Sequence, residues 1–200
     1  MKRARSIVAA GVLLAFWPSR ASADWLVMPF VSLTFKGATT LVDLDHAAGD
    51  TRVAYGGDVS YLGTGILGVE VDFGYSPGFF QGKRASSLIT SSHVVTLMGN
   101  VVLTTPINWT KLSLRPYLSG GFGAMRATTD DVLNLLKVRS TLAGLNAGGG
   151  VLGFFTERTG VRWDVRYFKS DRGAAETNAT GFGRPQLSFW RASMALVLRY

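Results

Sequence analysis

The stretch of sequence that decides the fold is WRASMALVLRY, residues 190–200. Every second residue of this stretch is apolar or aromatic, with the exception of a small alanine: Trp190, Ala192, Met194, Leu196, Leu198 and Tyr200. Arginine, serine and smaller apolar residues stand between them. Successive side chains of a β-strand point to opposite faces, so this period of two predicts a strand with one apolar face and one face that carries charge.

The same period recurs through the residues that precede this stretch. Residues 67–75 (LGVEVDFGY) and 161–167 (VRWDVRY) show it most clearly, because nearly every charged residue there stands between two apolar ones. We predict eight strands, at residues 25–35, 53–61, 67–75, 93–103, 114–124, 143–151, 161–167 and 190–200. The connections between them alternate between long (36–52, 76–92, 125–142, 168–189) and short (62–66, 104–113, 152–160).

Alternation alone leaves open which face points outward, since a soluble ligand-binding barrel has the same period with its apolar face inside. Two features favour a membrane. The clearest strands have the length of about 9–11 residues that a tilted strand needs to cross a bilayer. Aromatic residues stand near the ends of the apolar faces, where an interfacial girdle would lie. We therefore predict an all-β fold, an eight-stranded antiparallel up-and-down transmembrane β-barrel.

Charged residues occupy the less apolar faces of the predicted strands. If those faces line a narrow closed barrel, each charge must be paired, because an isolated buried charge is very costly. We predict a salt-bridged plug in which Arg115, Arg162, Arg166 and Arg191 pair with Asp58, Glu70, Asp72 and Asp164. A narrow ion path lined by these arginines is the alternative.

The first 23 residues have the pattern of a signal peptide. A cationic start with Lys2, Arg3 and Arg5 precedes an apolar run over residues 7–17, which is too short to cross a bilayer as a helix. Ala21 and Ala23 form a small-x-small cleavage site, so residues 24–200 are predicted to be the mature barrel. An N-terminal membrane anchor is the alternative. Removal of residues 1–23 leaves 17 basic and 13 acidic residues, a small net charge that gives no support to nucleic-acid binding.

No catalytic, cofactor or metal site is predicted. The chain has no cysteine and two histidines, His46 in a predicted loop and His93 at a strand end. We interpret His93 as an interfacial ring, although a lipid-modifying outer-membrane enzyme would need a histidine, a serine and an acid on one lipid-facing surface. GGGVLG at residues 148–153 formally matches a dinucleotide-binding motif, but it lies within a predicted strand.

NVVL at residues 100–103, RPYLSGGFG at residues 115–123 and the aromatic C-terminal strand resemble the barrel domain of the OmpA-type or opacity-type outer-membrane family. The resemblance implies a porin-like or structural envelope protein of a Gram-negative-type outer membrane, in contact with lipid and lipopolysaccharide. It also implies transit with periplasmic chaperones and assembly by the barrel-assembly machinery. The residues that this machinery would read are Trp190, Met194, Leu196, Leu198 and Tyr200. We expect a monomer that displays four loops, with a surface ligand as one role for them and a narrow channel as the alternative function.

Overall fold

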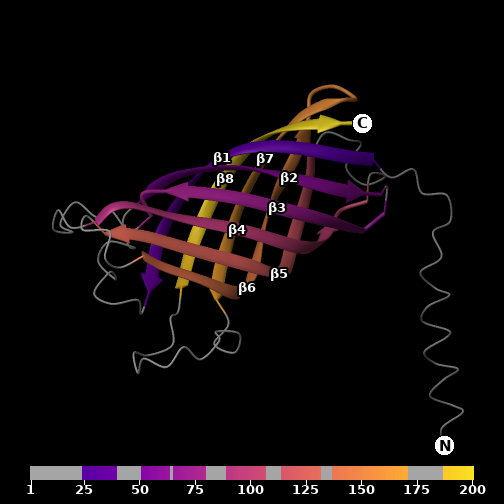
Figure 1. Ribbon diagram of the computed structural model, residues 1–200. Helices are drawn as coiled ribbons and strands as arrows, with labels where there is room; N and C mark the ends of the chain where they lie inside the picture. Colours follow the sequence, from indigo (N-terminus) through magenta and orange to yellow (C-terminus); the bar gives the residue numbers. More distant parts are fainter. Residues whose placement is uncertain are drawn as a thin grey trace, which may run out of the picture.

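A computed structural model describes residues 24–39, 51–63, 65–79, 89–106, 114–131, 137–170 and 187–200. They form the strands β1 (Asp24–Thr39), β2 (Arg52–Leu62), β3 (Leu67–Pro77), β4 (Ile89–Thr104), β5 (Leu114–Asp131), β6 (Lys137–Phe154), β7 (Thr159–Ser170) and β8 (Leu187–Arg199). Each strand pairs antiparallel with the next, and β8 pairs with β1, which closes the sheet (Figure 1). The predicted eight-stranded antiparallel barrel is confirmed.

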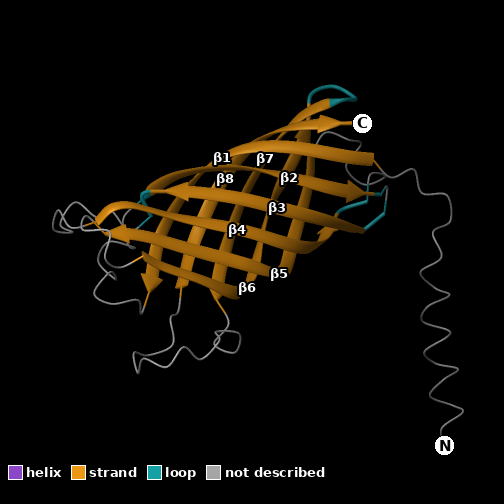
Figure 2. Ribbon diagram, in the orientation of Figure 1, coloured by secondary structure: helices purple, strands orange, loops and turns teal. Residues whose placement is uncertain are grey.

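Strand is the only regular secondary structure among the described residues (Figure 2). Within those residues, no helix has the length and apolar character needed to cross a membrane. The strands run obliquely, so those at the front of the barrel cross those at the back in Figure 1. Such tilt is required for closure of a sheet with few strands.

All eight predicted strands are present, and every predicted segment lies within or nearly within its observed strand. The largest difference concerns the connection predicted over residues 125–142. The β5–β6 ladder continues through Thr128 and Arg139, so only residues 132–136 separate the two strands. Backbone hydrogen bonds can extend a hairpin beyond the point where its apolar alternation ends. The apolar pattern therefore predicts strands that are too short here.

The two ends of the barrel are distinguished by the chain. At the terminal end β1 begins and β8 ends, and the turn at residues 155–158 joins β6 to β7. At the opposite end, which we call the loop end, β1 finishes and β2 begins.

Side chains alternate strictly between the interior and the exterior. On β3, Val69 and Val71 are 55% and 53% exposed, whereas Glu70 and Asp72 are 3% and 0% exposed. The same alternation runs along β7, where Trp163 and Val165 point outward and Arg162 and Asp164 point inward. The barrel therefore has a broad apolar exterior and a charged interior, the reverse of a soluble ligand-binding barrel.

Aromatic rings meet on the exterior near both ends. At the terminal end the rings of Trp25 and Tyr61 are 5.1 Å apart between centroids. Towards the loop end Tyr167 and Trp190 are 5.1 Å apart, and Tyr75 lies 5.4 Å from Tyr55. Their amphipathic rings are suited to the interfaces of a bilayer.

Candidate functional site

The interior of the barrel is filled in three successive layers. Side chains at the loop end form one apolar cluster, composed of Phe79, Val94, Met98, Met125, Ala127, Leu142, Phe168, Leu187 and Phe189. A second apolar cluster lies towards the terminal end and contains Leu26, Met28, Phe30, Leu62, Val102, Tyr117, Leu152, Ala195 and Val197. Between the two lies a layer that we call the charged belt, composed of Asp58, Glu70, Asp72, Arg162, Asp164, Arg166 and Arg191.

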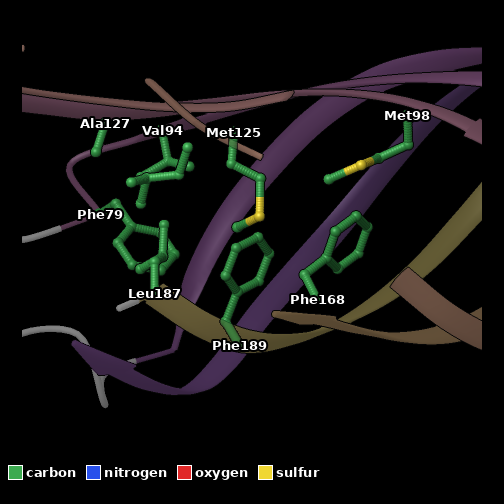
Figure 3. Close-up of a cluster of buried hydrophobic side chains, with 9 residues drawn as sticks. Phe79, Val94, Met98, Met125, Ala127, Phe168, Leu187 and Phe189 are labelled. Atoms are coloured by element: carbon green, nitrogen blue, oxygen red, sulfur yellow. The ribbon is translucent and has the colours of Figure 1, made fainter. Parts of the chain in front are cut away.

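The loop-end cluster packs rings against sulfur-containing side chains (Figure 3). Phe168 and Phe189 stack nearly parallel, with centroids 5.0 Å apart and planes at 8°. The ring of Phe79, which follows β3, meets Phe189 at 5.2 Å with its edge. Met98 and Met125 come from the opposite wall of the barrel (Figure 3). This cluster separates the charged belt from the loop end.

Strand β7 supplies three members of the belt from every second position. Arg162 Nη1 lies 3.2 Å from Asp58 Oδ2 and also binds Glu70, while its Nη2 lies 2.9 Å from Asp164 Oδ2. A single guanidinium therefore connects carboxylates from β2, β3 and β7. Because all these side chains are almost fully buried, each depends on the others for neutralisation.

Arg166 of β7 and Arg191 of β8 stand directly opposite each other in the ladder. Their two positive charges repel each other. Carboxylates from β3, across the barrel, relieve this conflict. Asp72 accepts hydrogen bonds from both Arg166 and Arg191, and Glu70 Oε1 lies 2.7 Å from Arg166 Nη1. Asp164 Oδ2 lies 2.9 Å from Arg166. The belt is therefore one connected network rather than a set of separate pairs.

Neutral side chains complete the network. The Tyr117 hydroxyl donates to Asp164 Oδ2 at 2.9 Å and accepts a hydrogen bond from Arg162 Nε. Ser60 and Asn100 donate to Glu70 at 3.1 and 3.0 Å, and Ser193 donates to Asp164. Sequence reasoning missed these four residues. Parity, which is the odd or even place of a residue along its strand, could have found them. Each of the four occupies an inward position of a predicted strand.

The guanidinium of Arg191 is also held by rings, lying 4.7 Å from the centroids of both Phe30 and Phe168. These two rings belong to the two apolar clusters, one on each side of the belt. A cation between two aromatic faces gains from both ring quadrupoles in a dry environment. The apolar layers therefore contact the belt directly.

Inward-facing glycines give the arginines room. A Cβ on Gly148 would lie 2.7 Å from Arg166 Cγ and 2.3 Å from the carbonyl oxygen of Val165. A Cβ on Gly74 would lie 2.7 Å from Arg191 Nη1. Gly148 belongs to the GGGVLG run. The structure explains the glycine at this position by the close approach of β7 and the Arg166 side chain.

Arg115 does not join the belt, which corrects the predicted plug. Its Nε donates to the carbonyl of Thr105 at 3.2 Å and its Nη2 to that of Gly63 at 3.3 Å. It is the second residue of β5 and lies at the terminal end, whereas its expected partners lie near the middle of their strands. Arg199, also at this end, pairs with Asp24 at 2.6 Å.

The residues expected to form the assembly signal lie along the exterior of β8. Trp190, Met194 and Leu196 are 38–50% exposed, Leu198 is half-buried, and Tyr200 is 77% exposed. The Tyr200 amide donates to the carbonyl of Trp25 at 2.9 Å, so the row reaches the seam between β8 and β1. Ala21 and Ala23 lie outside the described residues.

Of the two histidines, the structure describes His93. No three acidic, histidine or cysteine side chains among the described residues are grouped in a way that would hold a metal ion. The ring of His93 lies 5.6 Å from that of Tyr75, in the loop-end aromatic row. His46 lies outside the described residues.

A family model described as the outer membrane protein beta-barrel domain matches residues 7–184. Among solved structures, the chain is similar to the outer membrane protein OprG from Pseudomonas aeruginosa, with a TM-score of 0.62, 14% identity, and coverage of 90% of this chain and 97% of that one. Neisserial surface protein A gives a TM-score of 0.55 at 15% identity, with 87% and 97% covered. The N-terminal barrel domain of Pseudomonas aeruginosa OprF gives 0.50 at 14%, with 87% and 97% covered. The comparison with curated proteins finds no match.

Proposed function

We propose that this chain, which belongs to the outer membrane protein beta-barrel domain family, is a structural, non-conducting component of the outer membrane. In this proposal the barrel contributes to envelope integrity and holds four loops on the outer surface. Its partners are membrane lipid and lipopolysaccharide, and the loops are available to a surface ligand. Residues 1–23 direct export and are then removed.

The observation that supports a non-conducting barrel is the closed sequence of layers in its interior. A solute that entered from the loop end would meet the Phe168–Phe189 stack before it reached the charged belt. In the belt, arginines and carboxylates bind one another rather than face a water-filled lumen. An eight-stranded barrel has an interior that side chains can fill, so no passage is needed to explain the diameter.

The apolar side chains on the exterior of the barrel support the proposal that lipid surrounds it. Strand β3 alone presents Val69, Val71 and Phe73, each about half-exposed or more, without an intervening outward charge. In water such a surface would be an aggregation site, whereas in hydrocarbon it requires no cover. The aromatic contacts near both ends match the two interfaces of a bilayer.

The test is conductance in planar bilayers with the purified mature barrel. We expect no large, stable open state, and we expect Arg166→Met to produce openings because it removes a cation that binds Glu70, Asp72 and Asp164. Lys169→Met, on the exposed side of β7, is the matched control and should stay silent. A stable open state in the unaltered protein would instead assign the channel function.

We also propose that the chain has no catalytic role. The described histidine, His93, contacts the ring of Tyr75 in the outer aromatic row, where a packing role accounts for it. Lipid A from cells that express the unaltered protein, the His93→Ala variant or neither should give the same mass spectrum. A mass change that depends on His93 would assign a lipid-modifying activity.

A further inference from the structure

The charges of the belt do not balance. Its acidic members are Asp58, Glu70, Asp72 and Asp164, four carboxyl groups, and its basic members are Arg162, Arg166 and Arg191, three guanidinium groups. The plug predicted from the sequence has four arginines for four carboxyl groups only because it includes Arg115, which lies at the terminal end. With every group ionised, the belt would carry one net negative charge in a space enclosed by two apolar clusters.

Such an excess cannot stay ionised at low cost. A buried charge that lacks a partner is neutralised or finds a counter-ion, because loss of hydration is far more expensive than either. Arginine does not release its proton in proteins, so the adjustment must come from a carboxyl group. The structure identifies which one.

Asp58 stands directly opposite Asp72 in the β2–β3 ladder, and both side chains point inward. Two carboxylates in this relation repel each other. Asp72 is bound by both Arg166 and Arg191, whereas Asp58 has a single cationic contact, Arg162 at 3.2 Å. Asp58 is therefore the carboxyl group with the weakest cationic support among those described in the belt.

One oxygen of Asp58 also lacks a hydrogen-bond partner. Its Oδ2 accepts from Arg162, but its Oδ1 is buried and accepts no hydrogen bond from the described residues. An ionised oxygen left in this state would bear the full cost of lost hydration. A protonated oxygen would instead act as a donor, and the nearest acidic acceptor in the ladder is Asp72.

We propose that the belt is a proton-binding site, in which Asp58 takes up and keeps one proton from solvent as the barrel folds, and its O–H donates a hydrogen bond to the carboxylate of Asp72. This single proton makes the belt neutral and turns a like-charge contact into a hydrogen bond. The groups that face Asp58 are Glu70 and Asp72 from β3, Arg162 from β7 and Arg191 from β8, and Asp164 of β7 is connected to it through Arg162. The described β1 residue opposite Asp58, Met28, carries no charge.

The inference does not depend on whether the barrel conducts. It concerns the protonation state of one carboxyl group, and it would hold for a plug or for a narrow channel. A failure of the conductance test would leave it untouched, and its own failure would leave the proposed closure in place.

The direct test is infrared spectroscopy of the folded barrel in lipid at neutral pH. A carboxylic acid has a carbonyl stretch separate from the bands of carboxylates, and this stretch shifts in D2O. We expect such a band in the unaltered protein, its loss in Asp58→Asn, and its retention in Asp24→Asn, which alters a carboxyl outside the belt. Absence of the band, or its persistence in Asp58→Asn, would overturn the proposal. A bound sodium or potassium ion in place of the proton would also leave no band.

A second test uses the linkage between folding and protons. The carboxyl group of an unfolded aspartate is ionised above about pH 4, so folding would take up one proton between pH 6 and 8. The unfolding equilibrium constant of the unaltered protein should then rise about tenfold per pH unit in this range. Asp58→Asn should lack this contribution, and the two histidines are present in both proteins, so their effect cancels. Equal slopes would contradict the proposal, and the slope of the unaltered protein can be measured even if Asp58→Asn does not fold.

Discussion

Replacement of Arg166 by methionine is the sharpest perturbation of the charged belt. The side chain of Arg166 is completely buried and contacts Glu70, Asp72 and Asp164 at 2.7, 3.3 and 2.9 Å. Methionine keeps an unbranched chain of similar reach but removes the charge and all donors. The belt would then contain two guanidinium groups instead of three, and its four carboxyl groups would remain.

The size of the effect follows from these distances. At an effective dielectric constant of about 20, each contact is worth roughly 5–6 kcal/mol of Coulomb attraction. Most of this attraction is offset by the lost hydration of the ions. Removal of one partner from a buried ionic network leaves the other charges uncompensated and typically costs about 3–5 kcal/mol. We expect a loss in that range for Arg166→Met.

The assay is urea unfolding in lipid vesicles, followed by the fluorescence of the outward-facing tryptophans. Lys169→Met on the same strand is the matched control, because Lys169 is exposed and has no acidic partner among the described residues. The control should stay within about 0.5 kcal/mol of the unaltered protein. If Arg166→Met also unfolds within about 1 kcal/mol of it, the charged belt does not hold the barrel as argued.

Three further predictions concern the wall and the end of the barrel. Val71→Arg places a charge on the exposed face of β3 and should destabilise the barrel by about 2–4 kcal/mol in vesicle unfolding, whereas Val71→Leu should be close to neutral. Gly148→Val should cost about 1–3 kcal/mol in the same assay, because the new Cβ would meet backbone atoms of β7; an unchanged midpoint would refute the close approach. Deletion of Tyr200 should reduce insertion into the outer membrane, measured as the heat-modifiable fraction on gels. An undiminished fraction would remove this residue from the assembly signal.

The barrel was predictable from the sequence because its two faces differ so strongly. On β3, apolar residues at 69, 71 and 73 alternate with Glu70 and Asp72. This alternation allows only one assignment of residues to the two faces of the strand. The direction of the faces was also accessible, since strand length and aromatic placement both favour a bilayer. Strand ends were less accessible, because the β5–β6 ladder continues where its residues become polar.

The composition of the interior was only partly predictable. Parity correctly placed Arg162, Arg166 and Arg191 on the inward face. It does not predict where along the barrel axis an inward side chain lies. Arg115 has the right parity and lies too close to the terminal end to reach the belt. Tyr117 was passed over because a tyrosine on an inward face carries no formal charge, although it binds two members of the belt.

The most direct test of the account uses the absence of cysteine from the chain. Single cysteines at 69, 71 and 73, carrying spin labels on the mature barrel in vesicles, report contact with lipid through collisions with oxygen and contact with water through collisions with a nickel chelate. We predict high oxygen and low nickel accessibility at all three sites, and low accessibility to both at position 70. Nickel-accessible labels at 69, 71 and 73, in a protein that folds as a monomer in buffer without lipid or detergent, would contradict the outward orientation of the apolar face.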